Sequence, residues 1–293
     1  MRFASLMTAQ GPALAALGPD GPRNLTAVDP GLGADVGALL ASGADWLARA
    51  TQAAERAPAL ADYTFRPLVP APPKLLCLGL NDVEHAAEAG LPVPEVPEVF
   101  GRVASSLIGH GQPMLRPRES EQLDYEVELA VVIGAGGRRI AEADALAHVA
   151  GYTVFNDGSI RDWQVRTRQW TLGKNFHGTG ALGPWLVTPD EVPPGAHGLR
   201  MTTRVGDELL QDGDTANMVF GVARTIALLS QAMALEPGDV IALGTPKGIG
   251  FARKPQRFLK PGETCTVAIE GLGELANPIV DDPGPRGAAA QPE

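Results

Sequence analysis

Cysteine is scarce in this chain of 293 residues, in which it occurs only as Cys77 and Cys265. Two cysteines cannot build the disulfide framework on which a small secreted scaffold relies. Each lies in an apolar, strand-like run, so we expect buried, reduced thiols and a cytoplasmic location. The first residues also reach Gln10-Gly11-Pro12 before an apolar segment long enough for a signal peptide can develop.

Long hydrophobic runs and clusters of basic residues are also missing from the sequence. No stretch approaches the roughly 18 apolar residues of a membrane span. The 24 basic residues are spread along the chain against 34 acidic ones, which gives a net charge of -10 and makes nucleic acid an unexpected partner. Hydrophobic residues make up 44% and charged residues 20%, as in a globular protein with a packed core.

The chain divides by composition into three parts. Residues 1–70 form a small leading unit, with short strands followed by a helix expected over 36–56. Residues 67–73 contain four prolines and are interpreted as a linker, because proline cannot donate to a helix or a central strand. The catalytic domain is expected over 71–280, and the tail 281–293 is expected to be disordered because it has little apolar surface to bury.

Strand-like runs outnumber helices in the larger part. Since they do not alternate with helices, the pattern favours an α+β, strand-rich roll over a doubly wound sheet. A match to the dinucleotide pattern G-x-G-x-x-G at 178–183 is dismissed, because Pro184 and a strand follow it where a helix is required. Strands are expected at 75–80, 126–133, 152–155, 185–188, 199–205, 240–243 and 264–269, and helices at 141–150 and 215–235.

Two glutamates lie at the start of an apolar strand. Side chains alternate along a strand, so Glu126 and Glu128 project from the same face, with backbones about 7 Å apart. They repel each other unless a positive group lies between them. The uniformly apolar run 129–133 is typical of a strand buried on both faces, which places the acids at its end. An ordinary solvent-facing edge with two acids remains the alternative.

A third acid, Asp157, follows the strand expected at 152–155. Three carboxylates without a cysteine or histidine partner favour a hard ion, Mg²⁺ or Mn²⁺, with water or substrate oxygens completing the coordination. A simple Asp157-Gly158 turn is the alternative, and sequence spacing alone does not bring Asp157 to the glutamates.

His85 and Glu88 form a second candidate group. If residues 81–88 are helical, the two side chains share one face, and the carboxylate can orient the imidazole and raise its basicity. That arrangement suits a general base, although a solvated surface ion pair is also possible. Lys174 follows a glycine and is flanked by aromatic residues, so it is either a partly buried cation facing an anionic ligand or an ordinary solvated lysine.

These segments together resemble the fumarylacetoacetate hydrolase family, in particular its acylpyruvase-like members, from about Lys74 to Pro278. Their order and spacing make the resemblance specific. The matching pieces are Gly79-Leu80-Asn81, His85 with Glu88, Ser105 to Gly109, Asp124 to Glu128, Asn156-Asp157 with Ser159 and Arg161-Asp162, Gly173-Lys174, Leu235 to Ile241, and Gly244-Thr245-Pro246.

The resemblance implies a mixed β-roll catalytic domain, a small N-terminal domain and a homodimer. It implies that Glu126, Glu128 and Asp157 hold Mg²⁺ or Mn²⁺, that His85 and Glu88 activate water, and that Lys174 stabilises an enolate. Gln164 and Thr245 match positions that line the substrate pocket.

Three positions depart from the family pattern and bear on the specificity of the pocket. Asp82 replaces a tyrosine, Arg102 stands where lysine is common, and His177 stands where aspartate often occurs. Arg102 and His177 are therefore taken, with Gln164 and Thr245, as candidates for substrate binding.

Three functions fit this set of residues. The first is hydrolysis of a carbon-carbon bond in a 2,4-dioxo acid (an acylpyruvate), which yields pyruvate or a related 2-oxo acid and a carboxylic acid. The second is decarboxylation of an oxaloacetate-like acid, or tautomerisation, which needs the metal but not the attacking water. The third is a small-acid binding protein without activity. A soluble oxo acid, and neither nucleic acid nor membrane, is the expected partner.

Overall fold

The apolar run after Glu126 forms strand β10, Val127–Ile133, in which every residue is buried. Strand β11, Val149–Asp157, pairs with it antiparallel and is also buried throughout. One face of β10, with Leu129 and Val131, packs against a second sheet. The other face, with Ala130 and Val132, packs against residues from the start of the chain. A strand covered on both faces has no polar side to show, which explains the continuous apolar sequence.

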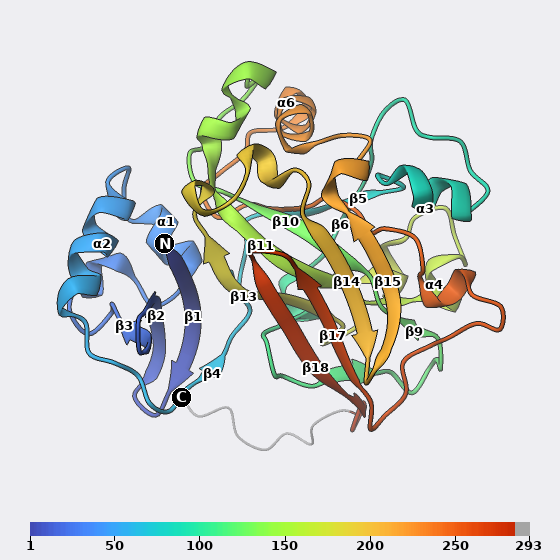
Figure 1. The fold of residues 1–293 in the computed structure, drawn as a ribbon, viewed down its shortest axis with the longest axis horizontal. Coiled ribbons are helices and arrows are strands. Elements are labelled where there is room, and N and C mark those ends of the chain that lie inside the picture. Colours follow the sequence, from blue (N-terminus) through green and yellow to red (C-terminus); the bar gives the residue numbers. More distant parts are fainter. Residues whose placement is uncertain (285–293) are drawn as a thin grey trace.

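The computed structural model describes residues 1–284, and in them β10 and β11 lie at the centre of an 11-stranded mixed sheet (Figure 1). Its main path runs β3-β2-β1-β13-β11-β10-β16-β5-β6, with β4 beside β1 and β7 beside β13. The other strands of this sheet are β1 (Arg2–Thr8), β2 (Gly11–Gly18), β3 (Gly21–Asn24), β4 (Thr64–Phe65), β5 (Leu75–Gly79), β6 (Glu98–Gly101), β7 (Leu107–Ile108), β13 (Gly180–Val187) and β16 (Val240–Ala242).

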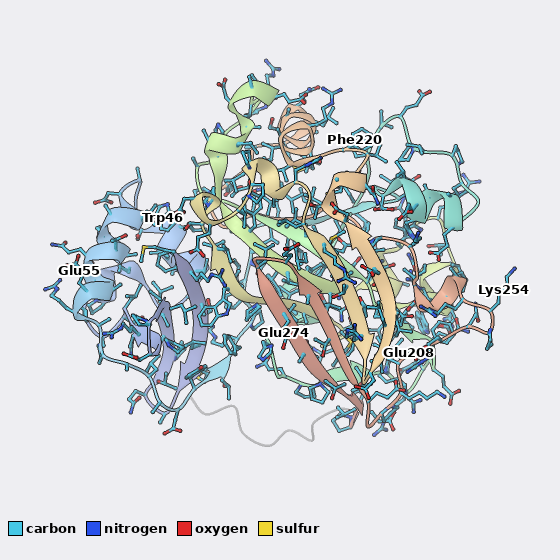
Figure 2. All side chains as sticks on the ribbon, viewed as in Figure 1. Trp46, Glu55, Glu208, Phe220, Lys254 and Glu274 are labelled. Atoms are coloured by element: carbon cyan, nitrogen blue, oxygen red, sulfur yellow. The ribbon has the colours of Figure 1, made fainter. Side chains whose placement is uncertain are left out.

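A five-stranded sheet in the order β15-β14-β17-β18-β8 covers the face of β10 that carries Leu129. Figure 2 shows side chains filling the space between the layers, while Glu55 and Lys254 point outward at opposite ends of the view. The strands are β8 (Met114–Arg116), β14 (Arg200–Val205), β15 (Glu208–Asp214), β17 (Thr264–Ile269) and β18 (Gly273–Asp281), and a separate pair is β9 (Leu123–Asp124) with β12 (Ser159–Ile160).

The leading strands continue the central sheet. β1 pairs antiparallel with β13, with Arg2 opposite Val187 and Phe3 opposite Leu186. The apolar cluster on this side contains Phe3 as well as Ala130 of β10. Segment 67–73, expected as a linker, has no regular structure. The strand-rich α+β class is confirmed, whereas a division of the chain near residue 70 stays a prediction.

The helices are shorter than the sequence predicted. The helix expected over 36–56 is two helices, because Gly43 adopts a φ of 131° between them, and the second begins at Trp46. The helix expected over 215–235 begins only after Gly221. The one expected over 141–150 is a 3₁₀ helix that ends at His148, and residues 149–150 belong to β11 instead. The helices are α1 (Val36–Ala41), α2 (Trp46–Arg56), α3 (Val83–Glu88), α4 (Arg161–Gln164), α5 (Thr171–Lys174) and α6 (Val222–Ala232), with 3₁₀ turns at Pro30–Leu32, Ala104–Ser106, Glu142–His148, Pro189–Glu191, Pro194–Ala196, Thr215–Asn217 and Gly250–Ala252.

Regular structure extends as far as the first residue of the tail that was expected to be disordered. β18 extends to Asp281, and the carbonyls of Asp282 and Pro283 accept hydrogen bonds from Arg118. The remainder of the expected disordered tail, 285–293, lies outside the described residues. Within residues 1–284, no helix has the length and apolar character needed to cross a bilayer.

Candidate active site

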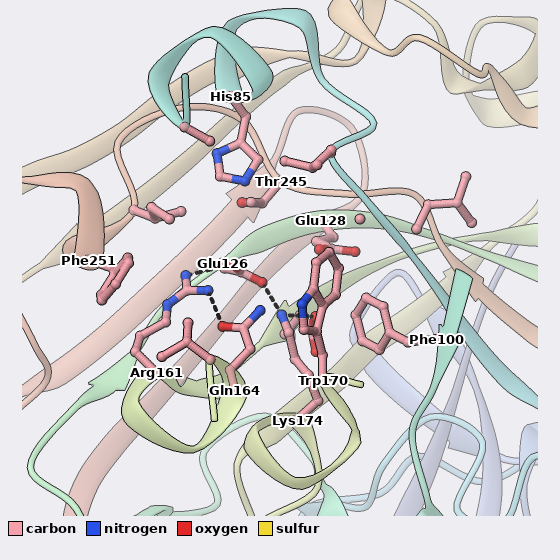
Figure 3. A pocket seen from close by; sticks show the side chains of 17 residues that line it. His85, Phe100, Glu126, Glu128, Arg161, Gln164, Trp170, Lys174, Thr245 and Phe251 are labelled. Carbon is pink, nitrogen blue, oxygen red and sulfur yellow. Dashed lines mark hydrogen bonds and ion pairs between the residues drawn. The ribbon is translucent and has the colours of Figure 1, made fainter. Parts of the chain in front are cut away.

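A pocket of about 180 Å³ opens where β10 begins and β11 ends. Figure 3 shows α3 on one side of it, with His85 pointing inward, and Arg161, Gln164 and Lys174 approaching from the opposite side. The volume suits a small organic acid rather than a nucleotide. Its lining consists of Leu78, Gly79, Leu80, His85, Ala89, Phe100, Glu126, Glu128, Asp157, Arg161, Gln164, Val165, Trp170, Lys174, Thr245, Ile249 and Phe251.

The strand pairing brings the three acids together. Glu126 directly precedes β10, Glu128 is the second residue of that strand, and Asp157 is the last residue of β11. The Asp157 amide donates a hydrogen bond to the Glu126 carbonyl at 2.9 Å, which sets the ends of the two strands side by side. One carboxylate oxygen from each residue lies within 4.8 Å of the others, and all three side chains are buried.

Two cations that line the pocket lie against this group. Lys174 Nζ is 2.5 Å from Glu126 Oε2 and 2.6 Å from Asp157 Oδ2. Arg161 donates to Glu126 Oε1 at 2.6 Å and to Asp124 Oδ2 at 2.7 Å. Burial alone would raise the pKa of Glu126, but Arg161 and Lys174 outweigh it and hold that pKa far below its ordinary value. Burial alone would lower the pKa of Lys174, but the negative charges of Asp157 and Glu126 outweigh burial, so the pKa is raised above its ordinary value.

Glu128 lacks such a cation. Its Oε2 accepts the Gly244 amide at 3.0 Å, and burial together with Asp157 and Glu126 raises its pKa well above the ordinary value. The excess of negative charge is what a divalent cation would remove. Three hard oxygen donors on a rigid pair of strands fit Mg²⁺ or Mn²⁺, and Glu126, Glu128 and Asp157 are the residues that would hold the ion.

Arg102 lies behind the acids rather than in the pocket. Its guanidinium donates to the Asp157 carboxylate, to the Gly158 carbonyl and to Thr179 Oγ1. The side chain is fully buried. A buried arginine with this set of acceptors fixes the orientation of Asp157, which is a role other than the predicted contact with substrate.

The short helix α3 carries the predicted base. Asp82 begins it, and its Oδ1 accepts the amides of Glu84 and His85 at 2.9 Å. His85 Nδ1 lies 3.5 Å from Glu88 Oε2, while Glu88 also accepts the Gly248 amide. Burial raises the pKa of Glu88, but His85 and the Gly248 amide outweigh it and lower the net pKa. The carboxylate therefore stays charged beside the imidazole, which can act as a base.

The other predicted substrate contacts divide in two. Gln164 and Thr245 line the pocket; Gln164 accepts from Arg161 at 2.8 Å, and Thr245 accepts from Gln211 at 2.9 Å. His177 is exposed and borders a separate hollow beside Leu115. The structure does not bring His177 to the pocket, because α5 ends at Lys174 and His177 lies beyond it, beside Leu115.

Sequence reasoning did not assign Arg161, Asp124 or the aromatic wall of the pocket. Asp124 accepts the amides of Gly250 and Phe251 at 2.8 and 2.9 Å in addition to Arg161, so it joins three segments of the chain. The available signal was that Arg161 follows Asp157 by four residues within one conspicuous polar segment.

A known family matches most of the chain. The model for the fumarylacetoacetate (FAA) hydrolase C-terminal region matches residues 74–280. A human relative named oxaloacetate tautomerase FAHD2A, mitochondrial, is 44% identical over 265 residues, which cover 89% of this chain and 84% of the relative.

Solved structures agree with this match. Fumarylacetoacetate hydrolase from Exiguobacterium antarcticum has a TM-score of 0.83 and 31% identity, covering 96% of this chain and 100% of the other. The 5-carboxymethyl-2-hydroxymuconate delta-isomerase from Mycobacterium smegmatis has a TM-score of 0.75 and 28% identity, covering 96% and 99%. The resemblance drawn from the motifs is thus confirmed, and the chain belongs to the fumarylacetoacetate hydrolase family.

Proposed function

We propose that this protein is a metal-dependent enzyme that interconverts the keto and enol forms of a small 2-oxo acid. The observation that carries the proposal is the convergence of three buried carboxylates with His85 and Lys174 on one pocket. The human relative that is named as a tautomerase supports this reaction type, since its sequence matches 89% of this chain. A bound Mg²⁺ or Mn²⁺ would act as a Lewis acid toward the 2-oxo group.

The side chains of the pocket supply the proton chemistry. His85, oriented by Glu88, takes a proton from C3 of the keto acid, and the electron pair moves toward the 2-oxo oxygen. Lys174 and Arg161 line the same pocket and would stabilise that negative charge. Return of the proton to oxygen completes the enol, and the reverse sequence gives the keto acid.

Hydrolysis of an acylpyruvate is the second candidate. It is favoured by the same His85 and Glu88 pair, which could instead deprotonate a water that attacks a distal carbonyl. Breaking the carbon-carbon bond would leave the same type of electron pair next to the 2-oxo group, so Lys174 and Arg161 would serve both reactions. The two candidates differ in whether water attacks a carbonyl and a carbon-carbon bond breaks, or only a proton moves.

A product analysis separates the candidates. The magnesium-loaded protein is incubated with the enol and keto forms of a 2-oxo acid, with an acylpyruvate and with oxaloacetate. Tautomerisation changes the enol absorbance without new products, hydrolysis releases a carboxylic acid, and decarboxylation releases carbon dioxide. If no oxo acid is turned over with either metal, the proposal is wrong and a binding protein without activity remains.

The homodimer and the cytoplasmic location also belong to this proposal. The homodimer rests on family resemblance, and the location rests on the two buried thiols. Light scattering on the purified chain tests the first, and cell fractionation tests the second.

A further inference from the structure

The cations of the pocket are already engaged. Arg161 uses Nε, Nη1 and Nη2 on Asp124, Gln164 and Glu126. Lys174 is shared between Glu126 and Asp157. Among the pocket-lining residues that the structure describes, no other lysine or arginine occurs. A second negative charge on a ligand would therefore meet no cation that is free of a carboxylate.

The balance of buried charges also disfavours a second carboxylate on the ligand. Four carboxylates, those of Asp124, Glu126, Glu128 and Asp157, face three cations, Arg102, Arg161 and Lys174, and all seven residues are at most 5% exposed. When all are ionised, the group carries one negative charge in excess, and a divalent cation reverses this to one positive charge. A ligand with one carboxylate restores neutrality, whereas a second carboxylate would leave a buried charge without compensation.

Most of the rest of the pocket is apolar, with His85, Gln164 and Thr245 as its remaining polar side chains. Trp170 lies against Gly79, where a Cβ atom would come within 2.2 Å of the indole ring, and its ring meets Phe100 edge-to-face at 5.5 Å. Figure 3 shows Trp170 and Phe100 on one side of the carboxylates and Phe251 on the other. Val165, on the rim, is 62% exposed. These side chains offer area for an apolar tail and carry no positive charge that could pair with a carboxylate.

We propose that the pocket selects a 2-oxo acid with a single carboxylate and an uncharged, apolar tail, and that Trp170, placed on Gly79, is the wall that the tail contacts. This rests on the proposed function, because the 2-oxo acid end is assigned to the metal carboxylates. It narrows the substrate class, since oxaloacetate and the carboxymethyl muconates carry more than one carboxylate.

The test compares two ligands of nearly equal shape by calorimetry on the full chain loaded with Mg²⁺. One is 5-methyl-2-oxohexanoate, and the other is 2-oxoglutarate, in which a carboxylate replaces the isopropyl group. We expect the apolar acid to bind at least tenfold more tightly. Equal affinities, or tighter binding of 2-oxoglutarate, would overturn the inference and leave the proposed function intact, whereas failure of both acids to bind removes both.

Amino-acid substitutions test which residues cause the preference for the apolar acid. Trp170→Ala should weaken binding of the apolar acid about tenfold and change binding of 2-oxoglutarate less than twofold. Gly79→Ala should do the same, because the new methyl group displaces the indole without removing a polar group. Leu172→Ala is the matched control, since Leu172 is 58% exposed on the same segment and outside the pocket lining. Unchanged ligand preference in a folded Trp170→Ala protein would overturn the role of the wall, and thermal unfolding establishes that each variant is folded.

Discussion

Both carboxylate oxygens of Glu88 accept a hydrogen bond from the amide of Gly248, at 2.9 and 3.1 Å. The loop that carries Gly248 is thereby joined to α3, the helix that carries His85. Because Glu88 Oε2 also lies 3.5 Å from His85 Nδ1, the loop contributes to the orientation of the imidazole. Glu88 thus connects the helix that carries the proposed base to the Gly248 loop.

Replacing the base tests the proton chemistry. His85→Ala should lower kcat by about 10²- to 10⁴-fold, the usual contribution of a general base, while leaving metal affinity unchanged. Steady-state kinetics and magnesium calorimetry give the two values. His148→Asn is the control, since His148 contacts the Ala135 carbonyl away from the pocket. Turnover by the His85 variant at the wild-type rate would exclude His85 as the base.

Glu88 should also give a pH-dependent contribution to stability. Its pKa in the folded protein is lowered, so the stabilisation is present above the ordinary glutamate pKa of 4.5 and is lost as the pH falls through the lower folded value. At pH 7 we expect Glu88→Gln to lower the free energy of unfolding by about 1 kcal/mol. Denaturant titrations from pH 7 down to 3 should show the gap closing.

The matched control for this effect is Glu84→Gln on the same helix. Glu84 pairs with Lys247 at 2.9 Å, with both side chains well exposed, so its contribution should be small. A gap for Glu88→Gln that stayed constant, or widened toward low pH, would contradict the assigned direction.

The three acids should respond differently to neutralisation. Glu128 faces other acids without a cation of its own, so Glu128→Gln should leave the metal-free protein as stable as the wild type or more stable. Asp157 is bonded to Arg102 and Lys174, so Asp157→Asn should lower the free energy of unfolding by roughly 3 kcal/mol. Both variants should bind Mg²⁺ at least tenfold more weakly.

Calorimetry with Mg²⁺ and Mn²⁺, and chemical unfolding with and without a chelator, measure these effects. Retention of wild-type metal affinity in both variants would remove the carboxylate site from the proposal. An equal loss of stability in the two metal-free proteins would contradict the difference in their surroundings.

Asn81 should be important for stability rather than for chemistry. It is 1% exposed, accepts the Phe220 amide at 2.8 Å, and donates to the carbonyls of Phe220 and Leu243. Asn81→Ala removes three hydrogen bonds to buried backbone groups, of which, in the described part of the chain, only the Phe220 carbonyl keeps another donor, Thr225 Oγ1. This loss should cost about 3 kcal/mol. Denaturant unfolding checks the value, and Asn81→Asp, which keeps the acceptor but loses the donors, should fall between. A variant as stable as the wild type would contradict this account.

Local sequence was sufficient for part of the site. The alternation of side chains in a strand predicted that Glu126 and Glu128 project together, and they do. The spacing of His85 and Glu88 likewise predicted a shared helical face, which α3 provides. Each inference concerned residues within four positions of each other, where backbone geometry alone fixes the relation.

Long-range relations were beyond local reasoning. Asp157 reaches the glutamates through the register of β10 and β11, which places Glu128 opposite Phe155 and depends on the whole fold. Arg161 acquires its role only from Asp124 and Glu126, which lie more than 30 positions earlier. The helix predicted over 36–56 is too long for a different reason. The apolar periodicity continues past Gly43 and favours one helix, although a glycine at that position can end a helix.

The pairing of β1 with β13 limits how this protein can be shortened. A chain that began after the linker would uncover the outer edge of β13 near Leu186, together with the apolar surface now covered by Phe3. An unprotected edge next to exposed apolar side chains is a template for aggregation. A protein shortened at the linker would therefore be less soluble, although every proposed catalytic side chain would still be present.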